Sequence, residues 1–567
     1  MTLIRNVPDH WDAETDLIAV GSGGGGLSAA ITAKEHGLDA MVLERTDMVG
    51  GVTAYSMGEV WVPGNHHAAA MGIEDSPESG FRYVKRLSLG YGDDRAILNQ
   101  AVHAPVVLRW FEERIGLKMT VIRNCPDYYY GATNDSVSEG RLLEAEPFPA
   151  ETLGEWQHRT RISPHVLYGM THEDIFANGG SPNILNWDWS VMGERLARDE
   201  RCLGPGLAGY FVKGALDRGI ALHTGVNVEE LIGDGERVVG IRATRDGQPF
   251  FVRARKGVVI AVSSYERNRD FGKTIGQQLE AQSVLMPEAD GAHLRLAGPF
   301  GARIARVPDV TMLAIRIPGE ELQEGVPLWR GVMPYIGLPH TIVVNRAGRR
   351  FANESFYRAI YFETDRISGA DQTHVNMPSW MVIDSQARAR YPIGSLMPGQ
   401  DLPEEMAIKA DSLHELAEKA GFDSAGFVET VDRWNRYWTE ARDPEFGRGE
   451  HAWGQWMSGD RGNRPHPNFG TIEQGPFYAL PLSRVAGSGI AAAGLLCDHH
   501  ARVMGWTGKP IAGLYAAGNS VARLDNGAVM QSGMSNARGM TQGWLAARHA
   551  AGQPSDLLER EAARLGL

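Results

Sequence analysis

Apolar and polar positions follow a regular order in the first 45 residues. An apolar run at 17–20 leads into a glycine-rich turn at 21–26, and a helical stretch of small residues follows. A second apolar run at 41–43 ends at the acid Glu44. Because buried parallel strands read as short apolar runs separated by helices, this order predicts the first strand–turn–helix–strand unit of an α/β sheet.

The pattern further along divides the chain into two domains. Over 1–295, strands, helices and glycine turns alternate, whereas 296–470 has mixed character and includes an amphipathic helix near 424–441. The last part, 471–567, is expected to return to the first domain, which a helix over 536–550 closes. We therefore predict a discontinuous first domain, made of the first and last parts, with a second domain inserted between them.

The glycines of the first turn have the spacing of a dinucleotide-binding fingerprint. Gly21 permits the tight turn, Gly23 lets the backbone approach a pyrophosphate, and Gly26 lets the helix pack close to the strand. The helix N-terminus offers free N–H groups and a partial positive charge to the phosphates. Glu44 can accept hydrogen bonds from ribose hydroxyls. The sequence therefore predicts a bound dinucleotide.

Two further glycine-rich segments indicate FAD as that dinucleotide. The segment 50–58 follows the acid directly and is small, polar and rich in backbone donors, as a loop against phosphate and flavin must be. The distant segment 513–519 supplies another short strand that ends in glycine, where the backbone can approach a cofactor closely.

In this arrangement the chain resembles the FAD enzymes of the fumarate reductase and 3-ketosteroid dehydrogenase superfamily along nearly its whole length. The segments that carry the resemblance are 50–65, 204–231, 238–241, 257–261 and 345–355. The resemblance implies an α/β fold: a discontinuous Rossmann-like FAD-binding domain with an inserted α+β substrate domain. The cofactor-binding residues that we expect are Gly21, Ser22, Gly23, Gly26, Glu44, Arg45, Gly51, Thr53, Ser56, Gly58, Val228, Gly518, Asn519, Met534 and Ser535.

The resemblance also implies two catalytic tyrosines. In ketosteroid dehydrogenases the base is a tyrosine just after the Asn-Glu-Ser segment, which is Tyr357 here, with Tyr361 as the alternative. A supporting tyrosine corresponds to Tyr128, with Tyr129 and Tyr130 adjacent to it. A free tyrosine has a pKa of about 10, so only about one in a thousand is ionised at neutral pH and the base needs assistance.

The carbonyl-binding segment departs from the steroid Δ1-dehydrogenase pattern. Val529 stands where those enzymes have a tyrosine, and valine cannot donate a hydrogen bond. We therefore expect the substrate oxygen to be held by the Gly533 N–H, with the Ser532 hydroxyl or the Gln531 amide beside it. This departure leaves both steroids and smaller cyclic ketones open as substrates.

The function that we predict is desaturation of the α,β carbon–carbon bond of a small apolar cyclic ketone by an FAD-dependent dehydrogenase. The electron acceptor stays open. The alternative is a fumarate reductase-type enzyme that reduces an enoate or enone. That branch needs an arginine in a motif that Arg523 does not match. A flavin-binding sensor without turnover is a third hypothesis, which no motif favours.

Composition bears on the partners, the location and the metal sites that we expect. The 567 residues are 43% hydrophobic and 22% charged, with a net charge of −13, so nucleic acid is not expected as a partner. Three unpaired cysteines, no apolar leader and no long apolar run predict a cytoplasmic enzyme without a disulfide framework or a membrane span. The pairs His66–His67 and His499–His500 have poor chelating geometry in sequence, so we expect no metal.

Overall fold

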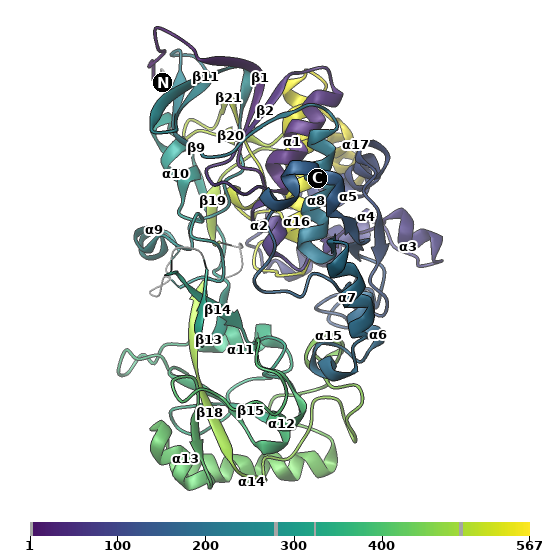
Figure 1. Cartoon of the computed structure of the whole chain (residues 1–567), viewed down its shortest axis with the longest axis vertical. Helices are drawn as coiled ribbons and strands as arrows, with labels where there is room; N and C mark the ends of the chain where they lie inside the picture. Colours follow the sequence, from purple (N-terminus) through teal and green to yellow (C-terminus); the bar gives the residue numbers. More distant parts are fainter. Residues whose placement is uncertain (1–3, 277–281, 323–324, 487–490) are drawn as a thin grey trace.

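The computed structural model describes residues 4–276, 282–322, 325–486 and 491–567, which form two large sheets, three small ones and the helices around them (Figure 1). The larger, eight-stranded sheet combines strands from both ends of the chain. Its main path runs through β20 (Arg502–Met504), β21 (Pro510–Ala516), β11 (Gln248–Ile260), β1 (Ala13–Val20), β2 (Ala40–Leu43) and β8 (Ala221–His223). The strands β9 (Val226–Gly233) and β10 (Val238–Arg245) extend it from β11.

The fingerprint unit forms as its sequence predicts. β1 pairs in parallel with both β2 and β11, and its last four residues are buried. α1 (Gly24–Glu35) packs against α16 (Met534–Ala550), the helix expected near the end of the chain. Small residues allow this approach, because a Cβ on Gly543 would lie 2.4 Å from the Gly25 carbonyl oxygen. The two ends of the chain therefore share one core.

The second sheet lies at the opposite end of the molecule (Figure 1). Its strands are β14 (Pro327–Gly331), β13 (Thr311–Glu321), β18 (Phe477–Ala486), β16 (Ser379–Ile383) and β15 (Thr341–Asn345), with β17 (Ile408–Ala410) paired to β18. The helices α13 (Leu413–Ala420) and α14 (Ser424–Glu440) pack on it, and the predicted apolar stripe of α14 enters their shared core through Phe427, Val431 and Trp434.

The return of the chain differs from the expectation at one strand. β18 lies within the part expected to rejoin the first domain, yet it pairs with β13 and β16 of the second sheet. The chain rejoins the larger sheet only at β20 and β21. An apolar strand pattern does not reveal its partner, because pairing depends on long-range register. The exact domain boundaries stay a prediction.

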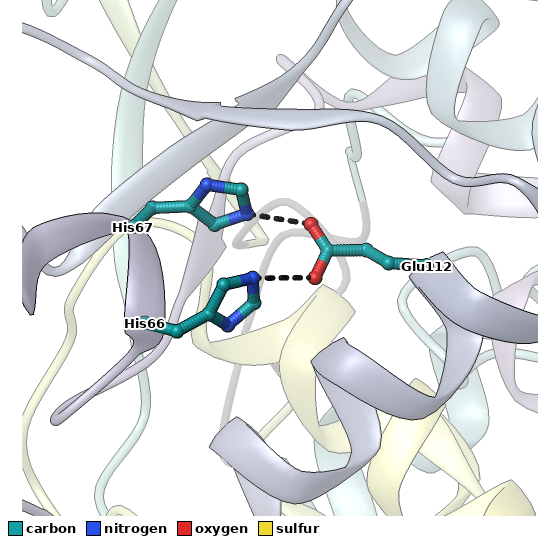
Figure 2. Close-up of side chains that lie close together, drawn as sticks. All are labelled: His66, His67 and Glu112. Carbon is teal, nitrogen blue, oxygen red and sulfur yellow. Dashed lines mark hydrogen bonds and ion pairs between the residues drawn. The ribbon is translucent and has the colours of Figure 1, made fainter. Parts of the chain in front are cut away.

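Between β2 and β8, the chain forms a layer of helices beside the larger sheet. α4 (Pro77–Leu87) packs against the long helix α5 (Asp94–Ile115), and α5 also contacts α16. The short helix α3 (His66–Ala70) meets α5 where its first two side chains face Glu112 (Figure 2). No helix in the described parts of the chain is long and apolar enough to cross a membrane.

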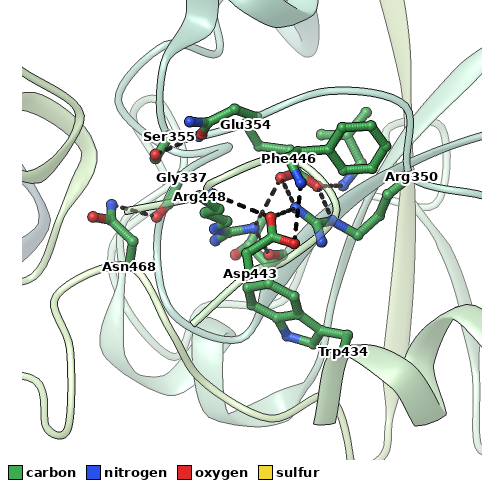
Figure 3. A network of polar contacts seen from close by, with 12 residues as sticks. Gly337, Arg350, Glu354, Ser355, Trp434, Asp443, Phe446, Arg448 and Asn468 are labelled. Carbon is green, nitrogen blue, oxygen red and sulfur yellow. Dashed lines mark hydrogen bonds and ion pairs between the residues drawn. The ribbon is translucent and has the colours of Figure 1, made fainter. Parts of the chain in front are cut away.

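A buried ion network anchors the segment that precedes α11 (Tyr357–Thr364) (Figure 3). Arg350 donates to both carboxylate oxygens of Glu354, at 2.7 and 2.6 Å, and to Asp443 at 2.8 Å. The ring of Trp434 lies under the Arg350 and Arg448 guanidiniums, at 4.7 and 4.6 Å. Breaking one partner of such a network leaves an unpaired buried charge, which costs about 3–5 kcal/mol. The network therefore holds the start of α11 firmly in place.

Candidate functional site

A cavity of about 420 Å³ lies where the two sheets and both ends of the chain meet. Its walls come from the fingerprint turn, the loop after β2, the helical layer, the second sheet and the segment before α16. The residues predicted from the sequence that line it are Gly21, Ser22, Gly23, Glu44, Arg45, Gly51, Thr53, Ser56, Tyr128, Val228, Tyr357, Gly518, Asn519, Ser532, Gly533 and Ser535.

Three predicted cofactor-binding residues do not line the cavity themselves but lie behind the residues that do. A Cβ on Gly26 would lie 2.0 Å from the Gly21 carbonyl oxygen, so Gly26 serves the close helix–turn packing expected of it. Gly58 has a φ of +77°, and a Cβ there would meet the backbone of Leu203 at 2.3 Å. Met534 is buried as the first residue of α16. These residues shape the cavity without lining it.

The fingerprint turn offers bare backbone to the cavity. Gly21 has a φ of +101°, and a Cβ on Gly23 would find its nearest neighbour 3.9 Å away, in the Gly51 backbone. The first N–H of α1, from Gly24, donates to the Thr53 hydroxyl at 3.0 Å. The helix N-terminus and the glycine backbone together form a cradle that side chains would fill. This cradle suits a pyrophosphate.

Two polar side chains extend the cradle along the β2 end. The Glu44 carboxylate accepts from the Ser22 hydroxyl at 2.6 Å and from the Thr46 N–H at 3.1 Å, which fixes its position at the end of β2. Arg45 donates to Asp290 and to the Glu288 carbonyl, both at 2.9 Å. Glu44 therefore stands where a ribose hydroxyl can reach it, and Arg45 secures the neighbouring wall.

The C-terminal segment closes the cradle from the other side. The Gly518 N–H donates to the Gln542 side chain at 2.9 Å. The Oδ1 atom of Asn519 is buried and has no hydrogen-bond partner among the described residues. Gly533, just before α16, has a φ of +80°, and a Cβ there would lie 2.5 Å from the Trp61 backbone nitrogen. Only glycine fits this position, so the conformation of the turn that presents the Gly533 N–H depends on this residue.

Two of the candidate tyrosines pack against each other in the cavity wall. The Tyr128 and Tyr357 rings meet edge to face with centroids 5.8 Å apart, and both side chains are buried. Burial and then the nearby Tyr128 raise the pKa of Tyr357 well above 10. Burial and the Glu59 charge also raise the pKa of Tyr128, but hydrogen bonds from Ser532 and Tyr357 act in the opposite direction. Burial dominates at both residues, so both are neutral phenols at pH 7, and the Tyr357 hydroxyl donates to the Met530 Sδ atom at 3.8 Å.

The alternative tyrosines occupy other positions. Tyr361 packs 5.2 Å from the Tyr357 ring but does not line the cavity. Tyr129 packs against Phe356, and Tyr130 is 41% exposed. Neither of them lines the cavity.

The segment before α16 presents one unpaired donor. The Oε1 atom of Gln531 accepts from the Tyr83 hydroxyl and from the Tyr128 backbone N–H, both at 2.9 Å. Its Nε2 group is buried and has no partner among the described residues, and the residue lines the same cavity. Because a buried donor without a partner is costly, this NH₂ group is a candidate donor for a ligand oxygen. Val529 is buried and does not line the cavity.

A charged cluster beside Tyr128 was not predicted from the sequence. The buried His172 ring lies 3.2 Å from a Glu59 oxygen and 3.0 Å from a Glu144 oxygen. Burial alone would lower the pKa of His172, but the two carboxylates outweigh it and raise this pKa to about 10. Glu59 and His172 line the cavity. No sequence spacing could reveal the cluster, because three separate segments contribute one residue each.

Two arginines near the site are already engaged. Arg523 is buried and donates to the Ala491 and Pro308 carbonyls, both at 3.0 Å, and it does not line the cavity. Arg330 does line the cavity, and it is paired with Glu320 at 2.5 Å.

Comparisons with known proteins find an FAD-binding family and dehydrogenases of cyclic ketones that are similar to this chain. The FAD binding domain family matches residues 16–535. The chain is 30% identical to 4-oxocyclohexanecarboxylate 2-dehydrogenase of Sinomonas cyclohexanicum, over 95% of this chain and 93% of that protein. It is 28% identical to 3-oxosteroid 1-dehydrogenase of Mycolicibacterium smegmatis, over 94% and 96%.

A solved structure of one such dehydrogenase has the same fold as this chain. The 3-ketosteroid Δ1-dehydrogenase of Sterolibacterium denitrificans, in complex with 1,4-androstadiene-3,17-dione, superposes with a TM-score of 0.85 and 29% identity. The match covers 95% of this chain and 99% of that one. The resemblance inferred from the glycine-rich segments, and FAD as the cofactor, are thereby confirmed.

Proposed function

Because the chain belongs to the FAD binding domain family, we propose that it is an FAD-dependent dehydrogenase that desaturates the α,β carbon–carbon bond of a cyclic ketone. The observation that carries this proposal is the convergence of Tyr357, Tyr128 and the donors before α16 on the cavity behind the fingerprint turn. Desaturation of a ketone needs a base for the α proton, donors for the carbonyl oxygen and an acceptor for the β hydride.

The cradle formed by both ends of the chain fits the cofactor. The Gly21–Gly25 turn and the N-terminus of α1 would hold the pyrophosphate, and Glu44 a ribose hydroxyl. Gly518 and Asn519 would close over the cofactor from the opposite side. When bound, FAD supplies the acceptor for the hydride that leaves the β-carbon.

The tyrosine pair supplies the proton chemistry. Tyr357 acts as the base in its phenolate form, so it takes the α proton of the ketone and becomes a neutral phenol. Tyr128, whose ring centroid lies 5.8 Å from that of Tyr357, is placed to stabilise the phenolate before the proton arrives. The C–H electrons shift toward the carbonyl oxygen as the proton leaves. Because burial raises the pKa of Tyr357 well above 10, the phenolate fraction rises with pH.

The donors before α16 hold the oxygen on which negative charge develops. The Gly533 N–H and the Gln531 Nε2 group are the two that we assign, with the Ser532 hydroxyl bonded toward Tyr128. Gln531 thereby supplies the donor that Val529 lacks. One such donor contributes about 2.7–4 kcal/mol to transition-state stabilisation.

The wall around this site supports an apolar ring as the substrate. Apolar residues from five segments line it: Ile175, Phe176, Val284, Met312, Met333 and Met457. The relatives are named for a 4-oxocyclohexane ring and for 3-oxosteroids, which share a six-membered ring with a ketone. We propose that this chain also binds a six-membered ring that carries a ketone.

Anaerobic mixing of the oxidised holoenzyme with ketones tests the proposal. Bleaching of the yellow flavin band is expected with a 3-ketosteroid or a substituted cyclohexanone, and none with the corresponding alcohol. The contrary result is a flavin that no cyclic ketone bleaches, but that an enoate reoxidises after reduction by dithionite. That outcome would assign the reductase activity instead.

A further inference from the structure

Outside the cavity, three side chains converge on one point at the surface of the helical layer. His66 and His67 begin α3, and Glu112 lies on α5 (Figure 2). One atom from each lies within 4.8 Å of the other two. The sequence offered no third ligand near the adjacent histidines, because Glu112 is far from them along the chain.

The geometry of this group is that of a chelate. The His66 Nε2 atom lies 2.9 Å from one Glu112 oxygen, and the His67 Nε2 atom lies 2.5 Å from the other. Both imidazole rings point toward Glu112 (Figure 2), and their centroids lie 4.1 Å apart. Ligand atoms bound tetrahedrally to one ion at about 2.0–2.2 Å stand about 3.3–3.6 Å apart, so movements of up to about 1 Å away from the Glu112 oxygens would admit an ion.

Both elements are held in place independently of the three side chains. The Asn65 side chain accepts from Ala68 at 2.9 Å and donates to the Val62 and Gly140 carbonyls at 2.7 and 2.8 Å. Glu112 stands near the end of a 22-residue helix. Ligands on anchored elements lose little freedom when a metal binds.

We propose that His66, His67 and Glu112 bind one divalent first-row transition ion, with Zn²⁺ as the reference ion. Two imidazoles and a carboxylate favour this class over Mg²⁺ and Ca²⁺, which prefer oxygen ligands. The side chains are 29%, 27% and 14% exposed, so water can reach the open coordination positions. The bound ion would clamp α3 to α5, a role independent of the dehydrogenase reaction.

The second histidine pair provides a matched control. His499 and His500 are also adjacent, with ring centroids 4.0 Å apart. His499 lies 3.7 Å from the carboxylate of Glu559, which is 55% exposed. Within the described residues, this pair does not belong to a group of three converging ligands.

The test uses tag-free holoenzyme, Zn²⁺ in competition with a chromophoric chelator, and Co²⁺ absorption. We expect one Zn²⁺ per chain, a Tm that rises with Zn²⁺, and visible Co²⁺ bands of an imidazole site. Loss of an outer-shell partner typically weakens metal binding 10–100-fold, so H66N/H67N and E112Q should weaken it at least about 100-fold. H499N/H500N should bind as the parent does.

Two results would overturn the proposal. One is a parent enzyme that shows neither stoichiometric binding nor a rise in Tm at Zn²⁺ concentrations that saturate the chelator. The other is binding that H499N/H500N abolishes and H66N/H67N leaves intact. Flavin content and far-UV circular dichroism identify any variant that fails to fold, and E112Q, which keeps the size of the side chain, then decides the outcome.

Discussion

Replacement of Tyr357 by Phe removes one hydroxyl from the cavity, and Tyr361 on the same helix offers the matched control. Both side chains are buried in α11, yet only Tyr357 lines the cavity and faces Tyr128. Tyr357→Phe should therefore greatly slow the removal of the α proton, whereas Tyr361→Phe should leave it intact. The ring is kept in both variants, so packing changes little.

The magnitude follows from the role assigned to the pair. General-base catalysis contributes about 10²–10⁴-fold, which corresponds to about 2.7–5.4 kcal/mol in the activation free energy. We expect flavin reduction in Tyr357→Phe to slow by that factor. For Tyr361→Phe we expect a change of less than about threefold, because the variant alters no group at the site.

The assay is anaerobic stopped-flow reduction of the flavin by a saturating cyclic ketone from pH 7 to 10. Because burial raises the pKa of Tyr357 well above 10, and a base acts in its deprotonated form, the parent rate should rise with pH throughout this range. Tyr357→Phe should lose this slope. The reasoning would be refuted if Tyr361→Phe lost the slope instead, or if Tyr357→Phe reduced its flavin at the parent rate.

Two further predictions concern the cofactor cradle and the charged cluster. Gly23→Ala, whose methyl group would meet only the Gly51 backbone at an ordinary 3.9 Å, should leave the apo-protein Tm nearly unchanged and weaken FAD binding. Gly26→Ala, with its Cβ 2.0 Å from a carbonyl oxygen, should destabilise the fold by about 1–3 kcal/mol; equal effects of both changes on Tm would contradict this. The carboxylates outweigh burial and raise the pKa of His172 from 6.5 to about 10, so its stabilising charge is fully present below pH 6.5 and lost as pH approaches 10. The excess stability of the parent over His172→Gln, measured by urea unfolding, should therefore shrink between these pH values, and a gap that widened would contradict the assignment.

The cofactor cradle could be predicted because its signals are local. Gly21, Gly23 and Gly26 lie within one turn, and their backbone roles follow from spacing alone. Glu44 comes directly after the next buried strand, so its place at the strand end was also predictable. The family resemblance added the distant partner of this cradle and the tyrosines.

The polar groups that complete the site could not be predicted in the same way. Glu59, Glu144 and His172 come from separate segments that only the tertiary fold brings together. The free Nε2 group of Gln531 depends on Tyr83, which fixes the other end of its amide from a distant helix. Such groups carry no spacing signal, since each alone reads as an ordinary polar residue.

A crystal structure of the oxidised holoenzyme with a non-reactive cyclic ketone analogue tests the central claim most directly. The account predicts one flavin held between the Gly21–Gly25 turn and the Gly518 segment. The ketone should lie against it, with its oxygen on the Gly533 N–H and the Gln531 Nε2 group and its α-carbon at the Tyr357 hydroxyl. A ketone bound elsewhere, or the Arg330 guanidinium in the place of Tyr357, would contradict the account.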